Sequence, residues 1–411
     1  MVTDELRSPT AGDYARPIDR ENQILALILK VGADIPEISR LSGIPAETVR
    51  YLYKEHVLKR RMRVQRELDH DKLGLKHIQF IVTSDPELEP LFYNNRNNNT
   101  LVSGVWEELY LNGMYRIIPE DQVFLDHLAP PSVHAKLRDL YRELEDLGAL
   151  KVHQTYDCSR VTHPRMWVED YNWELPGWDF DWSSSSLRPR QNVEDTPTSE
   201  PVKFDKTDLL LVQHLQYRYD QKVTDIAARE SIDRYSASWH FRKHVEARGL
   251  FGEYRINWLG TARDAENHRG GIPQQRQSHA GITFIAKNLS SAEMMNVRAH
   301  LHSIPYLWGE QVGDSDYCAD TFIPLNSLMD AFGFFSKILR PLEGRARIFT
   351  ADQSGSVLYT IHPRLFDQES KRWMYNGDLV LEGIRLALAG GALGSGLKDR
   401  KKEGAGLSSG A

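Results

Sequence analysis

A short basic stretch holds the side chains of this sequence that could do chemistry most directly. Between residues 54 and 66, six lysines and arginines accompany a single acidic residue, Glu55, so the local charge is +5. Such a density of cations suits the phosphates of a nucleic acid. The preceding segment, 46–58, has helical periodicity and places Thr48, Arg50 and Tyr51 at or near its exposed face, where they could reach base edges. The side chains expected on phosphates are Lys54, Lys59, Arg60, Arg61 and Arg63. The alternatives are a solvated basic strand or a face paired with the acidic linker.

The same pattern returns later in the chain. Residues 35–57 align without a gap on residues 223–245, with four identical positions, and residues 18–29 align on 204–215. From Lys222 to Arg255, seven basic residues oppose five acidic ones, a balance of only +2. The side chains that this copy would direct to DNA are Arg234, Tyr235, Ser236, Ser238 and Arg242. The alternative is a degenerate copy that is kept as a packing partner.

Each copy predicts three helices, a strand, and then a series of strand, helix, strand, strand, helix and strand. In the first copy the three helices are expected at 19–31, 35–42 and 46–58, and the strand within 59–68. A helix-turn-helix followed by a wing is a DNA-reading geometry. The later series is expected at 76–83, 86–97, 102–111, 114–120, 133–148 and 149–157, and in the second copy at 281–288, 291–303, 307–313, 317–325, 327–344 and 345–352. In the first copy, Asn112-Gly113 predicts a hairpin turn.

This order resembles the leucine-responsive regulator/AsnC family, present twice in one chain. The segment VGDSDYCADTFIPL, residues 312–325, is similar to the family's Gly-x-x-Asp-Tyr run, whereas the first copy keeps Gly113 but lacks the Asp-Tyr pair. The resemblance implies an α+β fold of two winged helix-turn-helix domains alternating with two ferredoxin-like domains. It implies a transcriptional regulator that binds double-stranded DNA, self-associates through the ferredoxin-like domains and binds a small effector. The effector residues would be Gly313, Asp314, Asp316 and Tyr317, although Asp316 could equally cap the hairpin.

Two other functions stay open. Siroheme-decarboxylase-like enzymes use the same fold, and His240, Arg242 and His244 are the nearest approach to their Arg/His-rich signature. A non-DNA-binding interaction module is the third class. Because the common motifs for enzymes are absent, we expect a regulator and not an enzyme, with no cofactor and no metal. The repeat of His56 at His244 suggests a structural role.

Composition limits the remaining possibilities. The chain has 411 residues, 41% of them hydrophobic and 26% charged, which predicts several globular domains. Two isolated cysteines and the absence of a long apolar segment predict a cytoplasmic protein without membrane spans. Four tryptophans between residues 167 and 182 should dock, either on their own sheet domain or over a basic DNA-binding face. The expected domains are 18–70 and 203–260 (winged helix-turn-helix), 74–165 and 280–365 (ferredoxin-like), 166–202 (Trp-rich acidic segment and linker) and 390–411 (disordered tail).

Overall fold

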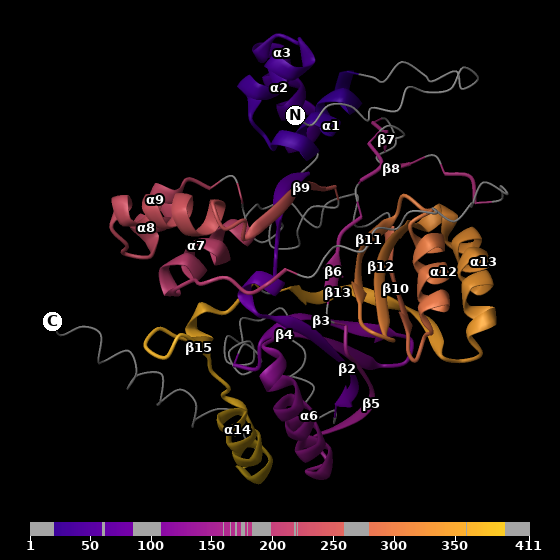
Figure 1. Ribbon diagram of the computed structural model, residues 1–411. Coiled ribbons are helices and arrows are strands. Elements are labelled where there is room, and N and C mark those ends of the chain that lie inside the picture. The colour runs from indigo at the N-terminus through magenta and orange to yellow at the C-terminus, as the bar shows by residue number, and fades with distance from the viewer. Residues whose placement is uncertain are drawn as a thin grey trace.

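The protein is an α+β structure built around one large antiparallel sheet (Figure 1). The computed structural model describes residues 20–59, 62–84, 108–158, 160–164, 166–168, 171–173, 177–178, 180–182, 199–217, 219, 221–258, 279–358 and 360–390. The expected helix at 86–97, most of the expected strand at 102–111, most of the expected linker, residues 259–278 and the expected tail beyond residue 390 lie outside these ranges. None of the helices in the described ranges is both long and apolar enough to cross a membrane.

Two helical units have the same order of elements. The first helical unit contains α1 (Arg20–Val31), α2 (Ile35–Ser42), α3 (Ala46–Leu52), the π-helix η1 (Tyr53–Leu58) and β1 (Arg63–Leu68). The second helical unit contains α7 (Lys206–Tyr217), α8 (Val223–Arg229), α9 (Arg234–His240), the π-helix η4 (Phe241–Glu246) and β9 (Phe251–Asn257). The three helices and the strand expected in each copy are therefore confirmed, except that each third helix continues as a π-helix.

Local side chains explain where these helices begin and end. The Asp34 carboxylate accepts the Glu37 backbone N–H and caps α2, which ends at Gly43 with a φ of 69°. In the second helical unit, the Asp233 carboxylate caps α9 by accepting the N–H groups of Tyr235 and Ser236. Val49 and Leu52 in the first unit and Ala237 in the second are buried and form part of the unit cores.

The two wing strands pair with each other instead of standing free in solvent. Strands β1 and β9 form an antiparallel ribbon in which Gln65 lies opposite Arg255. Arg66 of β1 donates to the Glu246 carboxylate at 2.9 Å and to the Phe251 carbonyl at 2.7 Å. The ribbon therefore fastens one helical unit to the other.

The large sheet consists of two halves joined edge to edge. The first sheet half has β2 (Lys76–Ser84), β3 (Leu111–Ile118), β4 (Gln122–Ala129), α6 (Pro131–Asp146) and β5 (Leu150–Tyr156). The second sheet half has β10 (His279–Ala286), α12 (Ser291–Leu301), β11 (Leu307–Val312), β12 (Tyr317–Pro324), α13 (Leu328–Leu339) and β13 (Ala346–Leu358). With β6 (Arg160–Thr162), the strand order is β5-β2-β4-β3-β13-β10-β12-β11-β6. Helices α12 and α13 lie together on one face of the second half, and α6 lies against the first (Figure 1).

The two halves also face each other across an interior. The side chain of Gln79 in β2 donates to that of Gln311 in β11, although these strands stand far apart in the strand order. Ile81 and Phe124 of the first half share one buried cluster with Ile285 and Phe349 of the second. The sheet therefore curves so that its inner face encloses a core.

The expected hairpin at Asn112-Gly113 is wrong. These residues lie inside β3, and the turn comes at 119–121, before β4, where Asp121 has a φ of 53°. The register of β3 on β4 shifts between Leu111 and Gly113, which marks a bulge of the kind that glycine permits. Asn112 is held in the strand because its side-chain amide donates to Asp126 at 2.8 Å.

The Trp-rich segment does dock, but not on the sheet domain that precedes it. Trp178 and Trp182 pack against Tyr306 of the second sheet half, and the Trp173 indole donates to Asn22 of the first helical unit. The segment does not bury the outer side of α3, where Tyr51 is 61% exposed. Its short strands are β7 (Tyr171–Asn172) and β8 (Gly177–Trp178).

The remaining short elements complete the described chain. The short elements are η2 (Asp71–Leu73), η5 (Leu325–Ser327), η6 (Arg340–Leu342), η7 (Pro363–Leu365), β14 (Phe366–Asp367), β15 (Arg372–Trp373) and α14 (Gly377–Gly390). Beyond the second sheet half, β14 pairs with β15, and α14 packs beside α6.

Candidate functional site

Polar side chains gather at one end of the space between the two sheet halves. Side chains alternate along β2, so Ile78 and Phe80 face the α6 side, whereas His77 and Gln79 share the inner face with Ile81. Asp126 lies opposite Gln79 on β4. A carboxylate this deeply buried needs full hydrogen bonding, and Asp126 accepts from the side chains of His77, Gln79 and Asn112.

A chain of hydrogen bonds runs from Asp126 toward the wing ribbon. His77 Nδ1 lies 2.9 Å from Asp126 Oδ1, and His77 Nε2 lies 3.2 Å from His70 Nδ1. Burial opposes ionisation of Asp126, but the neighbouring His77 and the three hydrogen bonds hold the pKa of Asp126 below its ordinary value. We call His70, His77 and Asp126 the relay.

The geometry of the relay determines what its outer end presents. Because ionised Asp126 accepts the His77 Nδ1–H, a neutral His77 has a bare Nε2 that accepts the His70 Nδ1–H. His70 Nε2 then carries a lone pair, and this buried atom has no hydrogen-bond partner in the described chain. A proton added at His70 Nε2 makes an imidazolium that the relay would stabilise, because His70 Nδ1–H donates to His77 and His77 donates to the ionised Asp126. Burial, followed by the field of His77, lowers the pKa of His70 to about 3.

Further cationic and imidazole groups lie around the relay. His163 Nδ1 donates to the Trp308 carbonyl at 3.2 Å, and His163 is close enough to His70 and His77 for their charges to lower its pKa further, after burial and Arg255. Arg255 of β9 lies 5.1 Å above the Trp308 ring. Burial lowers the pKa of this guanidinium, and no carboxylate of the described residues lies within 4.0 Å of it. We call the relay with His163 and Arg255 the junction site.

A second carboxyl group lies on the same inner face. The Thr283 hydroxyl donates to Asp320 at 2.6 Å, and the Tyr115 hydroxyl lies 3.2 Å from that of Thr283. Burial, together with the neighbouring negative charge of Asp126, raises the pKa of Asp320 to about 6, although the hydrogen bond from Thr283 opposes the shift. Two carboxyl groups whose pKa values are pushed apart are characteristic of acid and base chemistry. The interior therefore combines a proton relay, a protonatable carboxyl group and a desolvated cation.

The residues proposed from sequence for DNA contact lie on the helical units, away from this interior. On the first unit Arg50 pairs with Glu47 and Lys59 pairs with Glu55, while Tyr51 and Lys54 are exposed and Thr48 is half-buried. Arg63 belongs to the wing ribbon, whereas Arg60 and Arg61 lie outside the described residues. On α9, Arg234, Tyr235 and Ser236 are exposed, Ser238 is half-buried, and Arg242 is exposed at the start of η4.

The residues proposed for effector binding are used largely for packing. Tyr317 is fully buried and donates to Glu310 at 2.7 Å, and Asp316 accepts the Asp157 backbone N–H at 3.0 Å. A Cβ at Gly313 would lie 2.0 Å from the Asp157 carbonyl oxygen, so only glycine fits there. Asp314 is exposed beside them. The turn between β11 and β12 therefore packs against Asp157, the residue that follows β5.

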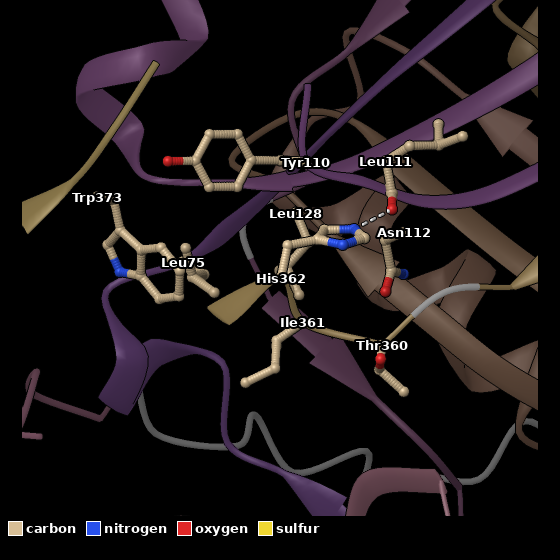
Figure 2. Close-up of a pocket in the computed structure, with 9 residues that line it drawn as sticks. All are labelled: Leu75, Tyr110, Leu111, Asn112, Leu128, Thr360, Ile361, His362 and Trp373. Atoms are coloured by element: carbon tan, nitrogen blue, oxygen red, sulfur yellow. Dashed lines mark hydrogen bonds between the residues drawn. The ribbon is translucent and has the colours of Figure 1, made fainter. Parts of the chain in front are cut away.

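A separate concavity beside Asn112 is too tight to take a ligand. Figure 2 shows Tyr110, His362 and Trp373 converging there, with the imidazole of His362 at 2.8 Å from the Leu111 carbonyl. Its lining leaves no room for a water molecule. This region therefore packs the C-terminal segment against the first sheet half.

None of the junction-site residues was singled out from sequence. They come from β2, β4, β9 and two connecting segments, so no short motif contains them. One signal was available: in the segment KHIQFIV, residues 76–82, polar His77 and Gln79 alternate with apolar Ile78 and Phe80. Polar side chains on the buried second face of a strand need hydrogen-bond partners, so this alternation indicates a polar cluster inside the fold.

Comparisons with known proteins give structural likenesses alone. No family model matches the chain, and no curated protein matches it. A crystal structure of the siroheme decarboxylase NirDL is similar with a TM-score of 0.49 and 10% identity, over 89% of this chain and 99% of that chain. The same enzyme in co-complex with an iron-uroporphyrin III analogue gives a TM-score of 0.46 and 10% identity over 90% and 98%. The crystal structure of PH0061 gives a TM-score of 0.26 and 15% identity over 37% and 94%.

One expectation from the sequence is corrected by these likenesses. The sequence predicts that the chain is not an enzyme, yet two of the similar solved structures are of a decarboxylase. The expectation rested on the absence of short enzyme motifs, and a site assembled from separate strands carries none. At 10% identity the likeness decides neither substrate nor reaction, which must come from the site itself.

Proposed function

We propose that this chain is an enzyme that decarboxylates a polyanionic substrate at the junction site. The observation that carries the proposal is the relay, which ends at the unpartnered lone pair of His70 Nε2. The charges of Arg255 and of His70 both lower the pKa of His163, so the three groups belong to one buried cluster. Decarboxylation replaces a carboxylate by a proton: R–COO⁻ and H⁺ give R–H and CO₂. The reaction therefore needs an anion-binding group and a proton donor, and the junction site contains both types of group.

Each residue has a distinct role in this proposal. Arg255 would bind a substrate carboxylate, and His163 would bind one after taking up a proton at Nε2, because its Nδ1–H already donates to the Trp308 carbonyl. The negative charges of the substrate would also raise the pKa of His70 from its low value in the free protein. His70 would take up a proton at Nε2, and the relay would stabilise it until the proton is delivered to the carbon that loses CO₂. Substrate binding should therefore take up protons and tighten as the pH falls.

The substrate class that we propose is a carboxylated tetrapyrrole of the siroheme type. One similar solved structure holds an iron-uroporphyrin III analogue, whose ring carries several carboxylates. The test mixes the purified full chain with iron-uroporphyrin III and with siroheme, following the visible absorption for binding and the loss of CO₂ by mass spectrometry. Neither binding nor CO₂ loss would overturn the proposal.

Two variants separate the roles. Asn at position 70 keeps a donor near the position of Nδ1 but lacks Nε2, so His70→Asn should preserve binding and lower kcat by roughly 10²–10⁴-fold. Arg255→Met should instead raise KM. Arg242→Ala on the exposed start of η4 is the matched control and should change neither.

A second candidate, DNA binding, is favoured by the outer face of α9. Tyr235 is 70% exposed and its ring carries the guanidinium of Arg234 at 4.7 Å, so both project from the helix that would enter a groove. The duplicated regulator-type unit that the sequence predicts is part of this second candidate function. Selection of duplexes from a random DNA pool tests it: Arg234→Ala should weaken an enriched site, and no enrichment would remove this candidate.

A further inference from the structure

We propose that the second helical unit binds one divalent transition-metal ion, best matched by Zn²⁺, through Asp205, Asp208, His240 and His244. One ligand atom from each residue lies within 4.8 Å of the others. Two carboxylates and two imidazoles are a donor set that zinc accepts in tetrahedral coordination. This site is separate from the junction site and independent of the proposed reaction.

The spacing of the donor atoms fits a single ion. His240 Nδ1 lies 2.8 Å from Asp208 Oδ1 and 3.6 Å from Asp205 Oδ1, and His244 Nδ1 lies 3.0 Å from Asp208 Oδ2. Bonds of about 2.0–2.1 Å to a tetrahedral zinc place neighbouring ligand atoms roughly 3.4 Å apart. The observed separations lie on both sides of that value, so small rotations of the side chains would complete the shell.

The backbone already holds the donors in place. Asp205 and Asp208 cap the start of α7 reciprocally: the Asp208 N–H donates to Asp205 at 3.0 Å and the Asp205 N–H donates to Asp208 at 2.9 Å. His240 ends α9 and His244 follows four residues later in η4, a spacing that places two side chains on one helix face. The helix start at α7 and the continuous segment from α9 into η4 therefore fix the backbone of all four donor residues.

The negative charges of the two adjacent carboxylates also favour a bound cation. Asp208 has a fully buried side chain, and Asp205 lies beside it. Within the described residues, the two imidazoles are the only cationic or titratable basic groups within 4.0 Å of either carboxylate. Both imidazoles keep a small exposed fraction, 13% and 16%, which gives an ion a path from solvent. A bound ion would cross-link the first and third helices of the unit.

The first helical unit supplies matched control positions. In the alignment of the two copies, Asn22 corresponds to Asp208, Leu52 to His240 and His56 to His244. The first unit thus keeps one imidazole but lacks the buried carboxylate and the second imidazole. Leu52 is buried in its core, so His240→Leu reproduces a packing that this fold accommodates.

The test measures zinc directly on the full chain. Chelator-treated protein is incubated with Zn²⁺, dialysed with excess Mg²⁺, and its metal content measured. We expect one Zn²⁺ per chain for wild type, for His56→Ala and for His70→Asn, and near zero for His240→Leu and for Asp205→Asn. Asp205→Asn keeps a capping oxygen, so it reports the loss of a ligand without the loss of the helix cap. Far-UV circular dichroism confirms that each variant is folded.

A second readout places the ion. Trp239 lies 4.6 Å from His244 and 5.0 Å from His240, measured between ring centroids, so Co²⁺ at the site should quench its fluorescence. The quenching should disappear in Trp239→Phe, while a visible tetrahedral Co²⁺ absorption persists. Wild type without zinc, or His240→Leu with undiminished zinc, would overturn the proposal and leave the imidazoles as hydrogen-bond donors to Asp208.

Discussion

The two helical units share one order of elements but complete their folds in opposite ways. In the first, Asn22 of α1 accepts the Trp173 indole N–H at 2.5 Å, so an aromatic segment from another part of the chain closes the unit. In the second, Asp208 at the corresponding position binds His240 and His244 of the same unit. One unit is closed by a docked segment and the other by its own side chains. The corresponding polar residues on the first helices of the two units, Asn22 and Asp208, therefore have different partners.

Each helical unit also packs against the sheet half of the other copy. The first helical unit shares its buried core with the Trp-rich segment and the second sheet half. The second helical unit packs with Leu128 of the first sheet half and with Leu73 and Leu75, which come just before β2. The wing ribbon crosses between them and carries Arg255 to the junction site. Stability of either unit therefore affects the candidate site.

The largest effect should come from the aromatic segment that closes the first unit. Trp178 is 7% exposed, contacts Tyr306 and Trp258 edge to face, and donates to the Trp167 carbonyl at 2.6 Å. Trp178→Ala should lower the free energy of unfolding by roughly 3–5 kcal/mol. Urea unfolding measures it, with Trp239→Ala as the control, since that side chain is 48% exposed. Equal effects of the two substitutions would contradict the distinction between the units.

The sequence was sufficient for the elements of both units and insufficient for their partners. Local signals such as the helical periodicity over 35–42 and 46–58 predict helices, and the structure has them. Pairing of β1 with β9 and docking of Trp173 on Asn22 join residues about 150 to 190 positions apart, which no local pattern encodes. The junction site depends on those long-range contacts, so its residues could be assembled only in three dimensions.

The next effect concerns the ribbon that joins the two units. Arg66 contacts Glu246, the Tyr219 hydroxyl and two backbone carbonyls of the second unit. Arg66→Ala removes the side-chain donor of the two carbonyls and the cation beside Glu246, which keeps only the Tyr219 hydroxyl, so it should cost roughly 3 kcal/mol in urea unfolding. Exposed Arg242→Ala should stay within about 0.5 kcal/mol. If Arg66→Ala is equally mild, the ribbon does not couple the units.

Exchanging the polar residues of the two first helices sharpens the comparison directly. Asn22→Asp keeps the acceptor for Trp173 but replaces the amide that donates to the Tyr171 carbonyl, so it should cost about 1–2 kcal/mol. Asp208→Asn weakens both imidazole contacts and should cost about 1–3 kcal/mol. Added Zn²⁺ should raise the Tm of wild type and of Asn22→Asp, but not that of Asp208→Asn. The same zinc response in all three would contradict the assignment of Asp208.

The smallest effect concerns Glu67, a carboxyl group of the wing ribbon that interacts with Arg255 of the junction site. Burial raises the pKa of Glu67 on β1 from its ordinary 4.5 to about 7, with Arg255 opposing the shift. The folded protein therefore holds a proton that the unfolded chain releases between these values, and stability falls as the pH rises from about 4.5 to above 7. Glu67→Gln removes this loss, so it should stabilise the protein by about 1–2 kcal/mol at pH 8 and be neutral near pH 4. Urea unfolding at both pH values checks it, and a gain that is the same at pH 4 and pH 8 would show that packing, not the proton, is responsible.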